Sequence, residues 1–168
     1  MTQSTRRDRV AKLVEQRRAI TPEVPLDGME ILARARRLTM LSRAPIEAVF
    51  ERHGLDTGEF DVLATLRRTD KPSVRPTELY QDLMISSGGL TDRLRRLEEA
   101  GMIERISCAE DKRSKRVGLT VRGRSVIDAA FAEDMEVERA LLSSLTSDQK
   151  AELADLLAQL LVSIEGAN

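Results

Sequence analysis

The segment from residue 86 to residue 119 constrains the fold of this chain more than any other. Leu90, Leu94 and Leu97 recur at i, i+4 and i+7, which gives a short helix one apolar face. Gly101 follows as a candidate C-cap, and after it come two short strand-like runs separated by a charged stretch. The segment therefore predicts a helix, a stop and a two-stranded hairpin with a basic tip.

The residues before this helix complete a recognisable motif. Ser86 and Ser87 can accept hydrogen bonds from the first turn, so we expect them to supply the N-cap. Pro76 suits the first turn of a preceding helix, whose Leu79 and Tyr80 we expect to point inward. Two short helices joined by a turn form a helix-turn-helix, and a charged hairpin after the second helix is the winged-helix pattern.

Apolar periodicity predicts further helices on both sides of this motif. Residues 29–52 fit one long helix, with a kink or a break near residues 42–44, because Pro45 lacks an amide hydrogen and crowds the preceding turn. Asp56 and Glu59 have the spacing of a capping box at the start of the next helix. The chain is therefore predicted to be mainly α-helical, with one two-stranded β wing.

The last predicted helix carries a broad apolar stripe. Thr146 and Gln149 have capping-box spacing at its start. Such a wide stripe favours pairing with a second copy of the chain over packing on the chain's own first helix. The stripe consists of Leu153, Leu156, Leu157, Leu160, Leu161 and Ile164.

Composition argues against several classes of protein. The longest apolar run is too short to span a bilayer and the Arg-rich start lacks a signal peptide's apolar core, so we expect a cytoplasmic protein without a membrane partner. A single cysteine, Cys108, excludes an internal disulfide, and we interpret it as a packing residue in preference to an oxidant sensor. With His53 as the only histidine, we predict no catalytic residues, no metal and no cofactor, and no enzyme activity.

Charge is distributed unevenly along the chain, although the net charge is only −1. Residues 86–124 hold ten Lys and Arg against six Asp and Glu, whereas residues 125–168 hold two against nine. A basic segment of this kind, within a protein kept soluble by acidic residues, is typical of a phosphate-binding surface. Without the helix before it, the basic hairpin would be interpreted as an exposed, solvated turn.

The predicted motif suits double-stranded DNA. An α-helix fits the major groove, where Arg93 or Arg96 can donate two hydrogen bonds to guanine and Thr91 can contact a thymine methyl group. The wing's basic residues suit the minor groove or its phosphates. The alternative is a winged-helix module that binds a protein and not DNA, which would need an exposed apolar patch.

Three sequence blocks, taken together and in order, resemble the MarR family of winged-helix transcriptional regulators. They are EFDVLATLRR at 59–68, LTDRLRRLEEAGMIER at 90–105 and DKRSKRVGLT at 111–120. The resemblance implies a homodimer that binds promoter DNA and acts as a repressor. It implies DNA contacts by Ser86, Ser87, Gly88, Thr91, Arg93, Arg96, Arg113 and Lys115, and the charge of the wing adds Lys112 to these candidates.

The same resemblance implies a division of the chain into four parts. These are an N-terminal extension (1–25), a dimerisation helix (26–54), a winged helix-turn-helix lobe (55–120) and C-terminal dimerisation helices (121–168).

Within the family, the chain looks most similar to the urate-responsive branch. That branch uses a Trp from an added N-terminal helix, an Asp in the EFD segment and an Arg early in the recognition helix, and Asp61 and Arg93 match the last two. The Trp is missing, with Leu13 at the nearest position, which argues against urate itself. An anionic aromatic ligand is expected to meet Arg93. The alternative for Asp61 is a simple salt bridge to a nearby Arg.

Overall fold

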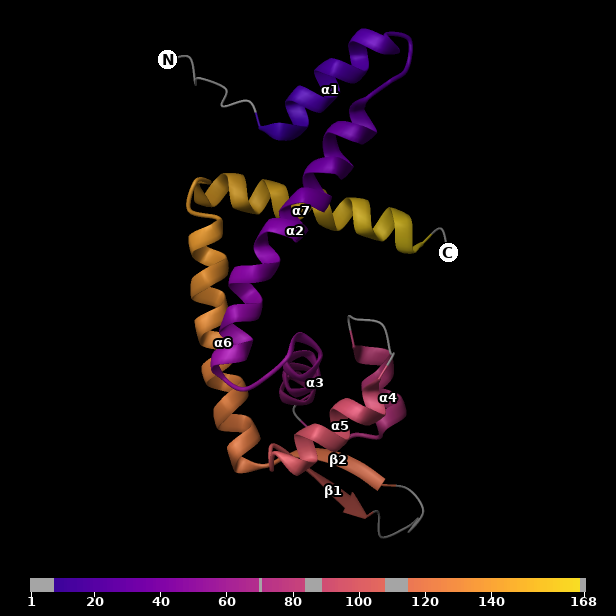
Figure 1. The fold of residues 1–168 in the computed structure, drawn as a ribbon. Helices are drawn as coiled ribbons and strands as arrows, with labels where there is room; N and C mark the ends of the chain where they lie inside the picture. Colours follow the sequence, from indigo (N-terminus) through magenta and orange to yellow (C-terminus); the bar gives the residue numbers. More distant parts are fainter. Residues whose placement is uncertain (1–7, 70, 84–88, 108–114, 167–168) are drawn as a thin grey trace. The chain divides into compact units, whose positions relative to one another are not determined.

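The computed structural model describes residues 8–69, 71–83, 89–107 and 115–166. It confirms the predicted mainly helical winged helix-turn-helix class with a two-stranded wing. No described helix is both long enough and apolar enough to cross a membrane. The elements are α1 (Arg9–Ile20), α2 (Asp27–Arg52), α3 (Thr57–Arg68), α4 (Pro76–Asp82), α5 (Leu90–Glu99), β1 (Ile103–Ser107), β2 (Lys115–Leu119), α6 (Val121–Leu141) and α7 (Ser147–Glu165) (Figure 1).

The chain forms two compact units, Met1–Ala44 and Pro45–Asn168, and α2 belongs to both. This helix is continuous through Pro45, so a break near residues 42–44 does not occur, and a kink there stays a prediction. An internal proline removes one helical hydrogen bond. The turns that follow are stabilised because their apolar residues, such as Phe50, are buried in the core of the second unit.

The first unit is a small helical hairpin of α1 and the first part of α2. Val10 and Val14 of α1 are buried against Leu26, so the N-terminal segment contains a packed helix. Asp8 caps α1 by accepting from the amide of Ala11, and its carboxylate also lies 2.8 Å from Nε of Arg34. The ion pair therefore ties the start of α1 to α2.

The second unit contains the winged helix-turn-helix, which we call the lobe (residues 55–120). In this unit α3 packs against α5 and α6, while α5 packs against β1 (Figure 1). The apolar side chains that these elements share form one continuous core. Its largest fully buried members are Leu63, Leu79, Leu97, Ile127, Val49, Val62, Val74 and Val117.

The wing is an antiparallel hairpin in which Ile103 lies opposite Leu119 and Ser107 lies opposite Lys115. A third segment joins it, because Val74 exchanges two backbone hydrogen bonds with Val117, at 2.9 and 2.8 Å. The loop before α4 is thereby fixed to β2.

The predicted helix ends are confirmed in several places. Both capping boxes form, at Asp56 with Glu59 and at Thr146 with Gln149. Pro76 occupies the first turn of α4. Gly101, with a φ of 68°, follows the last residues of α5 in the left-handed conformation that ends the helix.

Two local expectations are wrong. The N-cap of α5 is Gly89, at a φ of 92°, and not Ser86 or Ser87, which lie outside the described residues. A glycine N-cap provides no side-chain acceptor, so the start of α5 lacks a side-chain capping bond. Tyr80 is 51% exposed and not inward, because Leu79 alone takes the central core position on α4.

His53 has a structural contact at the end of α2. Its Nε2 lies 2.8 Å from Oε2 of Glu133, and the guanidinium of Arg52 donates to Oε1 of the same carboxylate. These contacts lower the pKa of the Glu133 carboxyl, with the His53 hydrogen bond as the main cause. The group joins α2 to α6 within the second unit.

Asp134 is a buried carboxyl on α6. It is only 4% exposed, and its Oδ1 has no hydrogen-bond partner among the described residues. Burial raises its pKa to about 6, with a further contribution from the charge of Glu138. The fold therefore favours the protonated form, and the ionised form destabilises it above about pH 6.

We predict that Asp134→Asn raises the free energy of unfolding at pH 8 by about 1–3 kcal/mol, since the buried charge is removed. The gain should shrink as the pH falls from 6 to 4, where the wild-type carboxyl takes up its proton. Urea unfolding at pH 8 and pH 4, at one protein concentration, measures the difference.

Asp128→Asn is the matched control, because hydrogen bonding to Arg67 lowers the pKa of the Asp128 carboxyl. Its substitution should reduce stability at pH 8, and this loss should disappear as the pH falls. An equal gain from Asp134→Asn at both pH values would contradict the assignment.

Candidate nucleic-acid interface

The recognition helix of the motif is α5, and the core sets its rotation. Leu90, Leu94 and Leu97 are buried, so the opposite face of the helix lies at the surface. Thr91 and Arg95 are exposed on that face. The amphipathic pattern of the sequence therefore produces the orientation it predicted.

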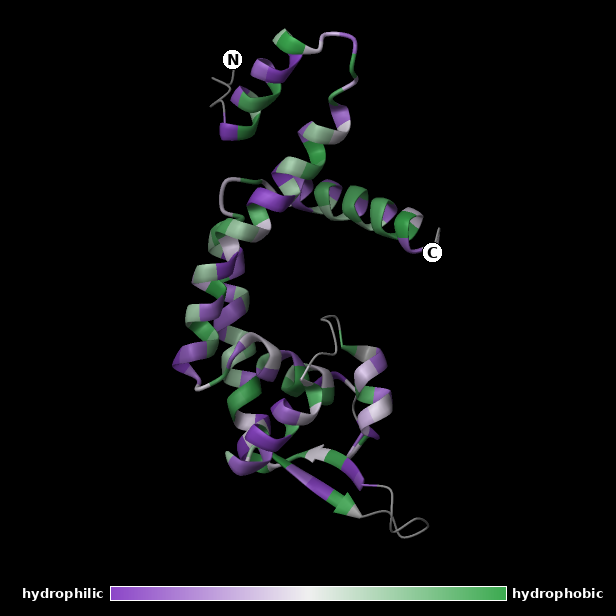
Figure 2. Cartoon of the chain, turned by 45° about the vertical axis from the view of Figure 1, so that its right-hand side comes forward, coloured by the Kyte–Doolittle hydropathy of each residue, from purple (hydrophilic) through white to green (hydrophobic). Residues whose placement is uncertain are grey.

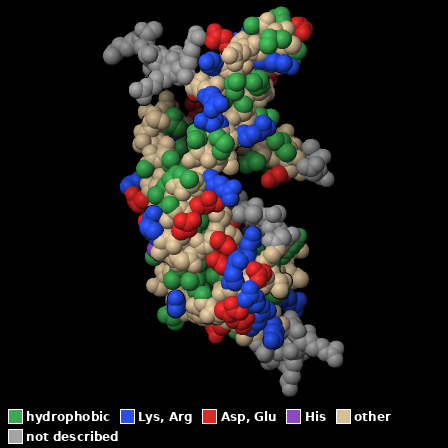
Figure 3. Space-filling view, viewed as in Figure 1, with side chains coloured by type: hydrophobic (Ala, Val, Ile, Leu, Met, Phe, Trp, Pro, Cys, Tyr) green, Lys and Arg blue, Asp and Glu red, His purple; other side chains and the backbone are tan. Residues whose placement is uncertain are grey.

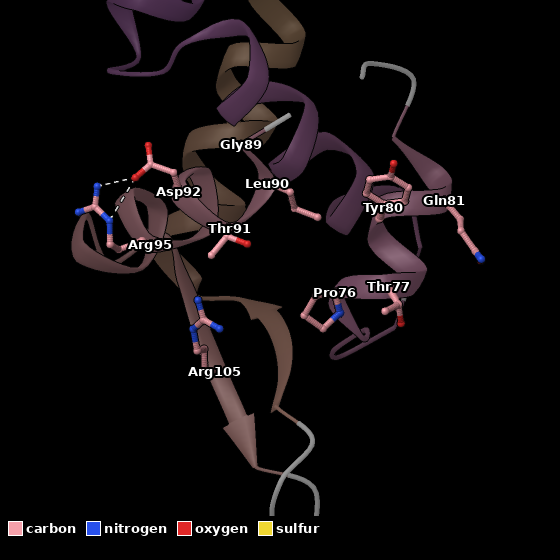
Figure 4. Close-up of a pocket in the computed structure, with 10 residues that line it drawn as sticks. All are labelled: Pro76, Thr77, Tyr80, Gln81, Gly89, Leu90, Thr91, Asp92, Arg95 and Arg105. Carbon is pink, nitrogen blue, oxygen red and sulfur yellow. Dashed lines mark hydrogen bonds and ion pairs between the residues drawn. The ribbon is translucent and has the colours of Figure 1, made fainter. Parts of the chain in front are cut away.

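An open hollow of about 970 Å³ lies along this face (Figure 4). Residues of α5 and α4 lie on opposite sides of it, and Arg105 reaches it from β1. Both helices of the helix-turn-helix and the first wing strand thus share one surface. The lining residues are Pro76, Thr77, Tyr80, Gln81, Gly89, Leu90, Thr91, Asp92, Arg95 and Arg105.

The predicted DNA-binding residues fall into three groups. Thr91 lines the hollow, and Lys115 is exposed at the start of β2. Arg93 and Arg96 lie on the side of α5 that meets α3. The remaining predictions, Ser86, Ser87, Gly88, Lys112 and Arg113, lie outside the described residues, as does Cys108.

Arg96 is held by three carboxylates. Its guanidinium donates to Asp56 and Glu59 of the α3 capping box at 2.7 Å each, and to Asp92 one helical turn back at 3.2 Å. These donors are engaged within the lobe, which differs from the predicted contact with guanine. In this structure Arg96 positions α5 on α3.

Arg93 lies across the first turn of α3. A Cβ at Gly58 would sit 2.2 Å from Nε and 2.3 Å from Cζ of Arg93, so the guanidinium occupies the space that a side chain would need. Nearby, Oδ2 of Asp61 is buried without a hydrogen-bond partner among the described residues. Burial raises the pKa of this carboxyl, and the charge of Arg93 opposes that rise.

The salt bridge considered as the alternative role for Asp61 does not form with any described residue. The charge of Arg93 lowers the pKa of the Asp61 carboxyl, but no ion pair joins these two side chains among the described residues. The two side chains therefore lie near each other across α3 and α5, and Oδ2 of Asp61 is left without a partner among the described residues.

Arg95 and its partners are functional candidates that the sequence analysis missed. Its Nη2 lies 2.6 Å from Oδ1 of Asp92, and its Nη1 lies 2.8 Å from Oε1 of Glu99. The hydrogen bond from Arg95 is the main reason that the pKa of Asp92 is lowered. The i, i+3 and i, i+4 spacing of acids and Arg along LTDRLRRLEE was the available signal.

Charge on α5 is balanced, with three arginines and three acids among its ten residues. Basic and acidic side chains accordingly alternate on the surface where Figure 1 places α5 (Figure 3). Arg105 of β1 joins this pattern by pairing with Glu98 at 2.8 Å. An overall neutral helix gains little from phosphates, so a strong phosphate contribution would have to come from other residues.

Comparisons with known proteins identify the family. Residues 55–115 match the MarR family. The chain is 34% identical over 151 residues to the HTH-type transcriptional regulator PecS of Dickeya dadantii, covering 89% of this chain and 91% of PecS.

Two solved structures have similar folds. Wild-type MarR from E. coli, in its apo form, is 27% identical with a TM-score of 0.59, covering 74% of this chain and 95% of MarR. MepR from S. aureus in complex with DNA is 21% identical with a TM-score of 0.69, covering 79% and 97%, and supports the fold alone. The chain belongs to the MarR family of winged helix-turn-helix transcriptional regulators, whose members are not enzymes.

Proposed function

We propose that the chain is a homodimeric repressor that binds promoter DNA and leaves it when a small anionic aromatic ligand binds. The observation that carries the DNA-binding part is the shared surface of α4, α5 and β1, which offers the exposed face of a recognition helix beside a wing. MepR, a relative in fold, is solved as a complex with DNA.

The proposed DNA contacts divide between helix and wing. The exposed face of α5 enters the major groove, where Thr91 can touch a thymine methyl group. Lys115 and the predicted basic residues of the wing contact the minor groove or its phosphates. Since α5 is neutral, the wing supplies most of the salt-dependent attraction.

We predict tighter binding to a duplex from upstream of the chain's own gene than to a shuffled duplex, with affinity falling as salt rises. Lys115→Ala should weaken binding to both duplexes. It should also make the decrease of log affinity with log salt less steep, by about 1 in the slope, because one phosphate contact is lost. Fluorescence anisotropy at several salt concentrations measures both effects.

Lys12→Ala, on α1, is the matched control and should leave the slope unchanged. Equal binding of the wild type to both duplexes, or no binding, would argue against an operator at this position and favour the protein-binding alternative.

The homodimer is supported by apolar faces that the single chain leaves exposed. Leu156 and Leu161 of α7 are each more than half exposed, and no residue of α7 is buried. Figure 2 shows hydrophobic residues along this helix. On α2, Ile31 and Leu38 are also exposed. Since monomeric proteins rarely expose this much contiguous apolar surface, a second copy of the chain is the proposed cover.

Leu157→Glu should convert the dimer to a monomer, because a carboxylate in an apolar interface loses its hydration. Analytical ultracentrifugation measures the mass of each variant. Gln159→Glu, on the opposite side of α7, adds the same charge and should leave a dimer. A dimeric Leu157→Glu protein would move the interface away from this stripe.

The proposed ligand site is formed by Asp61 and by Arg93, whose guanidinium packs against Gly58. Arg93 offers a cation and Asp61 a buried oxygen that no described residue satisfies. An anionic aromatic molecule would pair with Arg93, as the resemblance to the urate-responsive branch implies. In the proposed dimer, the two lobes can be spaced differently. A ligand that binds one spacing more tightly than the other shifts the population of molecules whose spacing fits DNA.

Isothermal titration should detect binding of a phenolic or purine anion to the wild type. Arg93→Ala should abolish it, and Gly58→Ala should weaken it because its Cβ displaces the guanidinium without removing the charge. Arg122→Ala, an exposed arginine of α6, is the control. Heat from none of these anions would exclude this class of ligand.

A further inference from the structure

We propose that Arg95, oriented by Asp92, reads one guanine in the operator, and that Glu99 competes with DNA for the same guanidinium. The inference rests on the proposed DNA-binding function and assigns the specificity of that surface. It replaces Arg93 and Arg96, the arginines predicted from the sequence, with the one arginine of α5 that lines the hollow.

The three arginines of α5 differ in where their side chains are held. Arg96 is bound to two carboxylates near the start of α3, and Arg93 lies against Gly58. The Arg95 side chain is 56% exposed and lies on the surface with Thr91. Only this guanidinium can meet a base edge without first leaving α3.

The hydrogen bonds of Arg95 leave the right atoms for guanine. Asp92 Oδ1 accepts from Nε at 3.2 Å and from Nη2 at 2.6 Å (Figure 4). These bonds use one edge of the planar guanidinium, while the far edge keeps one hydrogen on Nη2 and two on Nη1. That far edge can donate to O6 and N7 of guanine together.

Asp92 is itself fixed in place. Its second oxygen, Oδ2, accepts from Arg96 at 3.2 Å, and Arg96 is bound to α3. The orientation of Arg95 is thus linked through Asp92 and Arg96 to the core of the lobe. A pre-organised side chain loses less conformational freedom when it binds, which increases affinity for the correct base.

Glu99 occupies the far edge in the structure. Both of its oxygens accept from Nη1 of Arg95, at 2.8 and 2.9 Å. An exposed ion pair at i, i+4 changes the folding equilibrium of a helix by only about twofold. A bidentate contact with guanine favours guanine over another base by about 5- to 150-fold. Exchange of Glu99 for guanine is therefore favourable, and exchange for another base is not.

The test selects binding sites from a library of duplexes with 25 random base pairs, in parallel for the wild type and each variant, followed by sequencing. The wild type should select a motif containing a strongly preferred guanine. Arg95→Lys should reduce the preference for guanine over the other bases at that position by about 5- to 150-fold and leave the preferences at the other positions unchanged. Lysine keeps the charge but lacks the planar guanidinium that donates two parallel hydrogen bonds.

Three further variants sharpen the assignment. Asp92→Asn should reduce the guanine preference in part, since the neutral amide orients Arg95 less strongly. Glu99→Gln should tighten DNA binding about twofold with the motif unchanged. Arg139→Ala, which removes an exposed i, i+3 ion-pair arginine on α6, is the matched control and should select the wild-type motif.

Outcomes separate this inference from the proposed function. A wild-type motif that Arg95→Lys selects unchanged would overturn the role of Arg95 and leave DNA binding intact. A uniform loss of affinity across all positions, with the circular dichroism of the wild type, would assign Arg95 to phosphate and overturn base readout. A wild type that selects no motif would overturn both.

Discussion

The orientation of α5 about its own axis is the constraint on which the lobe depends. Its leucines are buried in the core on one side, and Arg96 is clamped to the first turn of α3 by Asp56 and Glu59 on another. Since a helix turns by about 100° per residue, these two restraints decide which side chains reach the surface. The capping box of Asp56 and Glu59 therefore has two effects. It stabilises the start of α3, and it fixes the orientation of α5 through Arg96.

Paired charges give the recognition surface a particular chemistry. Asp92 lies between Arg95 and Arg96, and Glu98 engages Arg105 of the wing, so every described arginine on this part of the surface except Arg93 has a carboxylate partner. Such pairs contribute little stability in water. The ion pairs do reduce the electrostatic attraction between this surface and any polyanion. A partner that binds here must therefore replace each broken ion pair with a well-aligned hydrogen bond.

Sequence patterns predicted the elements well and the side-chain partners less well. Apolar periodicity and capping residues located α2, α3, α4, α5, α7 and the wing, because the signals of Leu94, Asp56 and Pro76 act locally. The long helix over 29–52 was predicted, but a break at Pro45 was one of its two expected outcomes, and α2 has no break because packing of later turns outweighed a local preference. The contacts that Arg93 and Arg96 make within the lobe also escaped prediction, since both involve α3, more than thirty residues away in sequence.

The two backbone hydrogen bonds between Val74 and Val117 connect the helix-turn-helix to the wing. Two hydrogen bonds, together with the donation from Arg116 to the carbonyl of Ser73, join the loop before α4 to the wing strand β2. The strand β2 and the start of α4 are therefore joined, so a displacement of one is expected to move the other. The proposed base contacts of α5 and the proposed phosphate contacts of the wing would then form or be lost together.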